Sequence, residues 1–337
     1  MQLPDLIRKL GTLALASRLR RLSEFLSREA SEVYKELGFD FESRWFPLLY
    51  ALRNGESMAV TELSGSLGLS HPAVVQIANA MKKKRLLTST RDASDERRHL
   101  LALSKSGREL SESLEDVWKC ISESTADALK ASGRDLLLAL GAFEQELDRS
   151  GIRERSIHKV KILQYKSVRI EYYTPRLRSH FDRLNRHWLN EYFEVEPEDE
   201  KLLSDPNRRI VKKGGQVLFA MLGGDVVGTC AVIKIEDSTY ELVKMAVDPN
   251  ARRRQVGRRL VDEAVSWAKR HSARTMTLHT SKTLVAANNL YKKLGFREVL
   301  DTGKPTHKRP TIAMKLDISK YKPLCKLKGV NSVNVKQ

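Results

Sequence analysis

The chain has 337 residues and a formal net charge of +18, because 60 lysines and arginines face 42 aspartates and glutamates. The 41% hydrophobic content excludes wholesale disorder, and the length allows two domains that each bury a core. The excess of positive charge suits a polyanionic partner, although basic enzymes without one also exist.

Cysteine usage and the N-terminus bear on the compartment. Cys120, Cys230 and Cys325 lie far apart without metal-ligand spacing, so we expect neither a metal site nor a disulfide framework. Basic residues interrupt the apolar N-terminal stretch, and no run approaches the length of a membrane span. We therefore expect a cytoplasmic protein without membrane contact.

Apolar residues at helical spacing over residues 6–34 predict a long helix that packs on a partner. Farther on, Thr61 is expected to cap a short helix that ends at Gly68. Ser70 is expected to cap a second helix, residues 71–84, with Pro72 in its first turn. Two short helices joined by a tight glycine turn form a helix-turn-helix, whose second helix fits the DNA major groove.

The pattern of residues 86–103 predicts a strand, a polar basic turn and a second strand, and another helix is expected to start at Ser104. This order, with Asp95-Glu-Arg97 and Ser104-Lys-Ser-Gly107, resembles the winged-helix regulators of the MarR family over residues 1–150. The resemblance implies that Arg97 enters the minor groove and that residues 70–84 form the recognition helix. It also implies a homodimer through the helices of residues 6–34 and 108–148, which would read a near-palindromic site on double-stranded DNA.

One set of residues in this half is expected to meet DNA. The set comprises Ser70, His71, Val75, Gln76, Asn79, Lys83, Arg91, Arg97 and Arg98. The arginines sit at a hairpin tip beside a helix-turn-helix, which favours phosphate or minor-groove contact over a solvated charge run. For His71 and Gln76, base contact and a plain exposed helix face both stay open.

A second domain is expected at residues 165–318, after a polar linker at 151–164 and before a basic tail at 319–337. Its strands and helices alternate in a pattern that predicts a mixed sheet. The strand of residues 242–247 ends at Asp248-Pro249-Asn250, and an arginine-rich loop then leads to a helix that starts near Val256. The first turn of that helix favours a phosphate-bearing ligand, and Gly257 allows close approach to the backbone.

The loop reads Arg252-Arg-Arg-Gln255-Val-Gly257 and resembles the acyl-CoA-binding motif of GCN5-related N-acetyltransferases (GNAT). The family pattern has arginine or glutamine, two residues, glycine, one residue, then glycine or alanine, so Gln255 replaces the first glycine. A second matching stretch runs from Ala286 to Phe296. The resemblance implies a GNAT fold and acetyl-CoA as the acyl donor.

The same resemblance suggests two catalytic residues. Tyr291 occupies the position of a tyrosine that donates a proton to the leaving CoA thiolate, although it could instead simply pack beside Leu290 and Phe296. Glu241 lies on the strand where the family often holds a base, and could equally be an edge-strand charge.

A kink in the strand that carries Glu241 would let pantetheine add along the backbone. The expected cofactor-binding residues are Met245, Val247, Arg252, Arg253, Arg254, Gln255, Val256, Gly257, Arg258, Arg259 and Asn288. Leu284 stands where many family members have an asparagine, and Asn288 is the candidate substitute.

Together these features predict a two-domain α+β protein, mostly α winged helix-turn-helix followed by an α/β mixed sheet. The leading hypothesis is a transcriptional regulator that is also an acetyl-CoA-dependent N-acetyltransferase acting on an amine of a small molecule or protein. Two alternatives stay open: a regulator whose second half only senses acetyl-CoA or an amine, and an enzyme whose winged helix only dimerises. The acceptor is open too, since the acidic residues 194–200 could line a site for a cationic amine or form a solvated loop.

Overall fold

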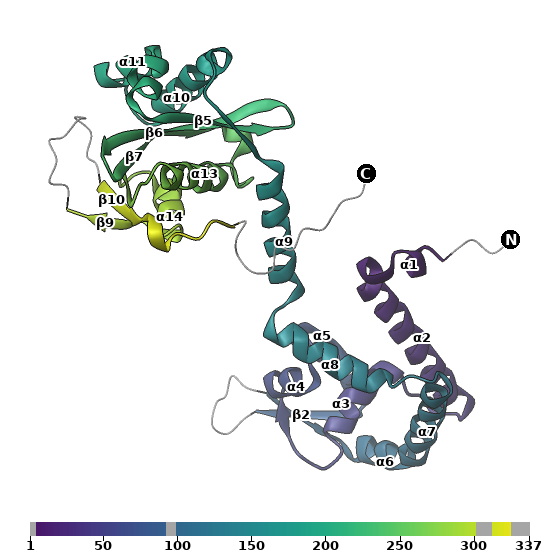
Figure 1. Ribbon diagram of the computed structural model, residues 1–337. Helices are drawn as coiled ribbons and strands as arrows, with labels where there is room; N and C mark the ends of the chain where they lie inside the picture. The colour runs from purple at the N-terminus through teal and green to yellow at the C-terminus, as the bar shows by residue number, and fades with distance from the viewer. Residues whose placement is uncertain (1–4, 92–98, 301–311, 325–337) are drawn as a thin grey trace. The chain divides into compact units, whose positions relative to one another are not determined.

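The computed structural model describes residues 5–91, 99–300 and 312–324. The chain divides into two compact units, residues 1–143 and 144–337 (Figure 1). Within the described ranges, every helix is too short or too polar to span a lipid bilayer.

The N-terminal unit is mostly helical and carries one small antiparallel sheet with strand order β1-β3-β2. Its helices are α1 (Leu6–Lys9), α2 (Leu15–Glu36), α3 (Phe46–Ala51), α4 (Val60–Leu67), α5 (His71–Lys83), α6 (Lys105–Ser113) and α7 (Glu115–Ala131), and α8 (Leu136–Arg149) spans the division between the units. Its strands are β1 (Met58–Ala59), β2 (Leu87–Arg91) and β3 (His99–Leu103).

Helices α4 and α5 form the predicted helix-turn-helix, and the turn between them explains why. Gly68 ends α4 in the left-handed conformation, with φ of 63°, where glycine meets no steric penalty. The Ser70 hydroxyl then accepts a hydrogen bond from the Ala73 amide at 3.4 Å and begins α5. The expected cap at Thr61 is wrong, because α4 begins one residue earlier. The Ala59 amide donates to the Glu62 carboxylate at 2.9 Å, so the helix is capped from its own first turn.

The core of this unit lies between the helix-turn-helix, the sheet and α3. Trp45, Leu48 and Leu49 are at most 1% exposed, and Val74 and Met81 of α5 reach the same cluster. The apolar face of α7 is covered from within the unit, since the Trp118 ring packs edge-on against Phe46 and Tyr50 at 5.3 and 5.6 Å. By contrast, α2 keeps large apolar side chains exposed.

The C-terminal unit is a seven-stranded sheet with helices on both faces, in the order β4-β5-β6-β7-β8-β10-β9 (Figure 1). Its strands are β4 (Arg169–Tyr172), β5 (Gln216–Leu222), β6 (Asp225–Glu236), β7 (Thr239–Val247), β8 (Thr275–Thr280), β9 (Arg297–Val299) and β10 (Ile312–Asp317). Its helices are α9 (Ile152–Ser167), α10 (Arg178–Tyr192), α11 (Pro197–Ser204), α12 (Pro206–Arg209), α13 (Val256–Arg270) and α14 (Val285–Lys293). Residues 152–164, within the segment that the sequence assigns to a linker, lie in α9.

Alternation along the strands divides the core into two layers. On β5, Leu218 and Ala220 face the layer that contains α13, whereas Val217 and Phe219 face the layer that contains α10. The two helices therefore cover opposite faces of the sheet. Gly228 lets α13 lie close to β6, because a Cβ there would stand 2.8 Å from the Val256 side chain.

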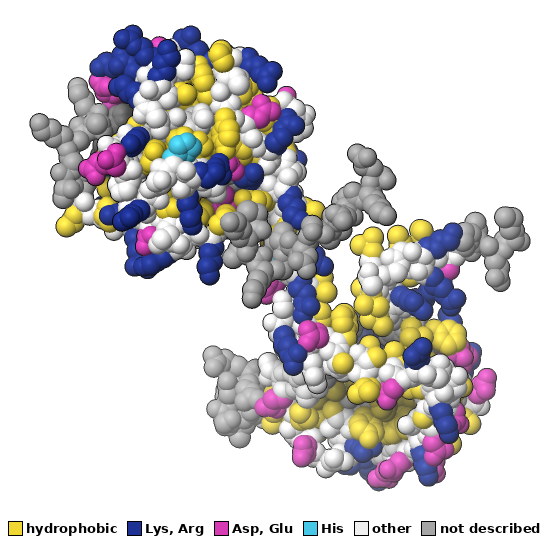
Figure 2. Space-filling model, viewed as in Figure 1, with side chains coloured by type: hydrophobic (Ala, Val, Ile, Leu, Met, Phe, Trp, Pro, Cys, Tyr) yellow, Lys and Arg dark blue, Asp and Glu magenta, His cyan; other side chains and the backbone are white. Residues whose placement is uncertain are grey.

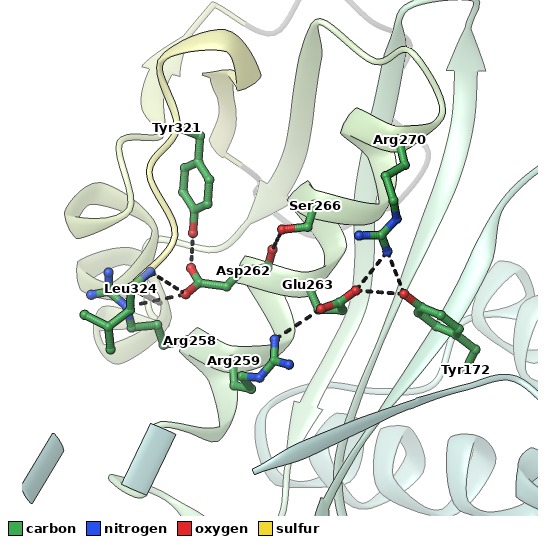
Figure 3. A network of polar contacts seen from close by, with 9 residues as sticks. All are labelled: Tyr172, Arg258, Arg259, Asp262, Glu263, Ser266, Arg270, Tyr321 and Leu324. Atoms are coloured by element: carbon green, nitrogen blue, oxygen red, sulfur yellow. Dashed lines mark hydrogen bonds and ion pairs between the residues drawn. The ribbon is translucent and has the colours of Figure 1, made fainter. Parts of the chain in front are cut away.

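Two neighbouring carboxylates on α13 tie this helix to distant parts of the chain (Figure 3). Asp262 is 1% exposed and accepts hydrogen bonds from the Tyr321 hydroxyl and from the Leu324 amide, the latter at 3.1 Å. Glu263 accepts from the Tyr172 hydroxyl of β4 at 2.7 Å and from Arg270 at 2.9 Å. Burial raises the pKa of Glu263, but these bonds outweigh it and hold that pKa below its ordinary value.

These networks predict different costs for two tyrosine substitutions. Tyr321→Phe should lower the free energy of unfolding of the C-terminal unit by about 1–3 kcal/mol, because a buried carboxylate loses its hydroxyl donor. Tyr172→Phe should cost less than about 1 kcal/mol, because Tyr172 is 40% exposed and Glu263 keeps its arginine partners. Urea unfolding followed by circular dichroism measures both, and equal losses would contradict the assignment of Asp262 as the buried anchor.

Candidate functional site

A cleft of about 1250 Å³ opens in the C-terminal unit where β7 and β8 separate. The two strands pair only from Thr239 to Glu241 of β7, against Thr275 to Thr277 of β8. Beyond this point, β7 pairs with β6 alone over the described residues. The kink expected in this strand is present, since the β6–β7 register shifts between Thr229 and Ala231.

The shift in β7 centres on Lys244, which has a φ of 52° although it is not glycine. A non-glycine residue in the left-handed conformation costs about 1–3 kcal/mol of folding free energy, and it persists only where the surrounding structure holds it in place. The surroundings do so here, because the Lys244 ammonium forms an ion pair with the Asp199 carboxylate of α11, which is 0% exposed. The other Asp199 oxygen accepts from the Glu196 amide at 3.0 Å. Sequence reasoning missed this pair, since a lysine on a strand looks like an exposed charge.

Tyr291 lies on α14 and reaches the cleft beside the bulged strand. Its hydroxyl stands 3.9 Å from the Met245 sulfur, and its ring packs edge-on against Phe296 at 5.7 Å. Burial, with a smaller contribution from the Cys230 thiol, raises the pKa of the phenol above its ordinary value. A phenol is protonated at neutral pH even at its ordinary pKa, so the Tyr291 hydroxyl can act as a proton donor.

Glu241 also lines the cleft, and it is not alone. Its carboxylate lies 2.7 Å from Nδ1 of His279 on β8, and the two side chains are 21% and 35% exposed. Sequence reasoning did not single out His279. The pair sits where β7 and β8 part, and it can accept a proton through either the carboxylate or the imidazole.

The loop before α13 forms the other end of the cleft. Gln255 is the N-cap of α13 and adopts a left-handed conformation with φ of 62°. Glycine adopts this conformation at no steric cost, so Gln255 has a backbone conformation that a glycine at this position could also adopt. Gly257 then leaves little room, because a Cβ there would stand 3.2 Å from the Leu290 side chain.

The five arginines of this loop and of the first turn of α13 do not share one environment. Arg252 donates to both Glu191 oxygens, at 3.1 and 2.6 Å, and Arg259 donates to Glu263 at 3.2 Å. Arg258 approaches Asp262 at 3.9 Å. Arg253 and Arg254 are exposed and make no ion pair with another described residue. Of the five, Arg252, Arg253 and Arg258 line the cleft.

Asn288, predicted to bind the cofactor, is not among the residues that line the cleft, and its side chain is engaged within the chain instead. Its amide oxygen accepts from the Thr280 hydroxyl at 3.0 Å, and its nitrogen donates to the Ser281 carbonyl at 2.9 Å. The side chain thereby ties α14 to the end of β8. Both its oxygen and its nitrogen are engaged within the chain. Met245, Val247 and Val256 complete the predicted set, and all three line the same cleft.

In the N-terminal unit, α5 presents the face that the sequence predicts for DNA. His71, Gln76, Asn79 and Lys83 are exposed, Val75 is half-buried, and Val74, Ala78 and Met81 point into the core. The Ser70 hydroxyl is engaged as the N-cap of α5, and Arg91 is exposed at the end of β2. Arg97 and Arg98 lie outside the described residues.

Comparison with protein families identifies both halves. Residues 39–98 match the model of the MarR family, and residues 181–296 match the model of the acetyltransferase (GNAT) family. The second match contains the whole cleft, from Trp188 to Tyr291.

Relatives match over part of the chain. An uncharacterized N-acetyltransferase of Bacillus subtilis is 31% identical over 29% of this chain and 66% of its own length. An N-acetylaspartate synthetase of Mus musculus is 33% identical over 29% of this chain and 33% of its own length. The chain thus spans less than two thirds of either relative. A GNAT-family acetyltransferase structure from Staphylococcus aureus gives a TM-score of 0.42 and 20% identity, over 45% of this chain and 99% of that one.

The GNAT-family match contains the cleft between β7 and β8, and the MarR-family match contains the helix-turn-helix. The chain is a fusion of a MarR family domain and a GNAT-family acetyltransferase domain.

Proposed function

We propose that the C-terminal unit is an acetyl-CoA-dependent N-acetyltransferase and that the N-terminal unit is a DNA-binding transcriptional regulator. The observation that carries the first part is the position of Tyr291, whose protonated phenol lies in the cleft beside the bulge of β7.

The cleft has the donor groups that acetyl-CoA needs. Beyond Glu241, the edge of β7 that faces β8 is free of strand pairing, so the backbone of Met245 and Val247 can hydrogen-bond an extended pantetheine arm. The first turn of α13 offers backbone amides to the pyrophosphate, and Arg253 adds positive charge to the cleft without a competing carboxylate among the described residues. Bound acetyl-CoA supplies the acetyl group as an activated thioester.

The residues of this chain can move the two protons that acyl transfer requires. The Glu241–His279 pair accepts the proton that the attacking amine must lose. Tyr291 lies beside the bulge of β7 and donates a proton to the sulfur that must leave. The proton count therefore balances, with one taken up and one released.

The exposed face of α5 and the net charge of +18 support binding of double-stranded DNA by the first unit. A homodimer is supported by α2, where Leu19, Leu22, Phe25 and Leu26 are 39–49% exposed. An apolar face of this kind suits a two-fold interface, which would present two recognition helices to DNA.

The acceptor is an amine of a small molecule or a protein. The synthetase relative is named for N-acetylaspartate, which is an acidic amino acid acetylated on nitrogen. This name supports transfer to an amine in the present chain as well.

Removal of the phenol tests the catalytic half. Tyr291→Phe should lower kcat by about 10²-fold or more in an assay of thiol release from acetyl-CoA, with the Kd for acetyl-CoA nearly unchanged. Tyr240→Phe is the matched control, because Tyr240 is a tyrosine of β7 that is 3% exposed and does not line the cleft. If the wild-type chain binds acetyl-CoA but acetylates no amine, the unit is a sensor and the proposal fails.

The left-handed backbone conformation at Gln255 predicts different effects for two substitutions of this residue. Gln255→Gly should keep the Kd for acetyl-CoA within about threefold, because glycine adopts the left-handed conformation freely. Gln255→Val should weaken binding by about fivefold or more and destabilise the unit by about 1–3 kcal/mol, because a β-branched residue strongly resists this conformation. Calorimetric titration distinguishes the two, and equal tolerance of both variants would contradict the role given to the conformation.

A salt titration tests the DNA-binding half. The affinity of the full chain for duplex DNA should fall steeply with salt, and Lys83→Gln should reduce the slope of log K against log salt by about one. Lys130→Gln on α7 is the control, because this lysine is exposed and lies outside the helix-turn-helix. An affinity independent of salt would favour a winged helix that only dimerises.

A further inference from the structure

The wall of the cleft on the α10 side carries a distinct set of charges. Aromatic residues of α10 form one part of this wall, with the Trp188 ring 5.9 Å from Tyr192 and 5.6 Å from Phe193. Residues of α11, of α12 and of the 3-10 turn η4 (Val211–Lys213) continue it. We refer to the residues of this region that line the cleft, 188–213, as the acceptor wall.

The carboxylates of the cleft are already matched with cationic or imidazole partners. Glu198 pairs with Lys201 at 2.5 Å, and Asp199 pairs with Lys244. Glu241 lies against His279 at 2.7 Å. Glu200 points to a different partner, since both of its oxygens accept from Arg186 at 2.6 Å. Glu198, Asp199 and Glu200 are therefore neutralised within the chain, and the other acidic residues of 194–200 do not line the cleft.

The cations of the acceptor wall are not matched in the same way. Arg209 and Lys213 both line the cleft and are exposed, and neither forms an ion pair with another residue in the described ranges. Figure 2 shows lysine and arginine side chains gathered over the end of the C-terminal unit that carries α11. With Lys201, Lys234 and Lys244, five cationic side chains outside the cofactor loop face three carboxylates along this cleft.

The backbone that carries Arg209 and Lys213 is held firmly. Ile210 lies between them and is 0% exposed in the core layer of α10. At Gly215 a Cβ would stand 2.4 Å from the Val232 carbonyl oxygen and 2.9 Å from the Ile210 side chain, so the segment lies directly on β6. The two cations therefore project from a backbone that is packed against the sheet.

From these charges we infer that the acceptor is a small primary amine that also bears carboxylate, an acidic amino acid being the best match. This inference rests on the proposed transferase function. The amine approaches the Glu241–His279 pair, while a carboxylate meets Arg209 and Lys213 at the acceptor wall. The arginine fork can bind both carboxylate oxygens, and the lysine adds a point charge. Trp188, Tyr192 and Phe193 contact the apolar part of the molecule.

The test compares matched acceptors with the full-length chain and acetyl-CoA, measured by thiol release. The acceptors are L-aspartate, L-glutamate, L-glutamate dimethyl ester and spermidine. The value of kcat/KM should be about 100-fold higher for one of the two free amino acids than for the ester or for spermidine, which corresponds to about tenfold for each of two carboxylate contacts. The ester keeps the amine and carbon skeleton, so it isolates the carboxylate charge.

Variants locate the anion site. Arg209→Gln and Lys213→Gln should each raise KM for the preferred amino acid by about tenfold with little change in kcat, because they remove binding made equally in the ground and transition states. The double variant Arg209→Glu/Lys213→Glu should shift the preference toward spermidine. Lys212→Gln is the control, because Lys212 is an exposed neighbour that does not line the cleft.

The outcomes distinguish a failure of the inferred acceptor class from a failure of the proposed transferase function. If spermidine or the ester is acetylated as well as the free amino acids, or if the Arg209 and Lys213 variants leave KM unchanged, the inferred acceptor class is wrong and the transferase stands. If acetyl-CoA binds but neither free amino acid accelerates thiol release, the inferred acceptor class is wrong. If no amine of a wider panel that includes peptide lysines accelerates it either, the proposed transferase function itself is overturned.

Discussion

The buried ion pair between Lys244 and Asp199 is the interaction on which the site depends. It joins a strand to a helix 45 residues away and fixes a left-handed residue inside a β-strand. Because β7 bulges there, its pairing with β8 ends at Glu241, and the cleft opens along the unpaired edge. A buried pair of this kind contributes little to net stability, since desolvation offsets the Coulomb attraction. Its value lies in the geometry it specifies.

The same bulge explains why the functional groups meet. Glu241 occupies the last paired position of β7 before the strands part, and His279 lies two residues beyond its partner Thr277 on β8. Tyr291 reaches the opened edge from α14. The two faces of the sheet are therefore covered by different groups. In the proposed transferase, the layer of α13 would present helix-terminal amides and arginines to the cofactor, and the layer of α10 would present aromatic rings and cations to the acceptor. The opening between the strands is where the two can react.

Elements with a local signal could be predicted from the sequence, whereas contacts between distant residues could not. The apolar period of β5 ends at Gly223-Gly224, and Gly68 with Ser70 marks the turn of the helix-turn-helix, so these elements lie where the sequence places them. Tyr291, Gly257 and the arginine loop were found through short motifs. The partners Asp199 and His279 were missed because no pattern links them to Lys244 and Glu241, which lie 45 and 38 residues away. Thr61 was misassigned because Glu62 supplied a cap that competes with a threonine cap.

Gln255 shows that a chain can form a left-handed turn before a helix without a glycine at that position. The backbone at this residue has the torsion angles that a glycine would have, and α13 starts from it without interruption. A search that demands the glycine would pass over this chain, although the turn that the glycine usually marks is intact. Proteins that keep the turn with glutamine, asparagine or another tolerant residue would be overlooked in the same way. A survey that identifies such loops by their torsion angles would therefore find more of them than a survey that identifies them by a sequence motif.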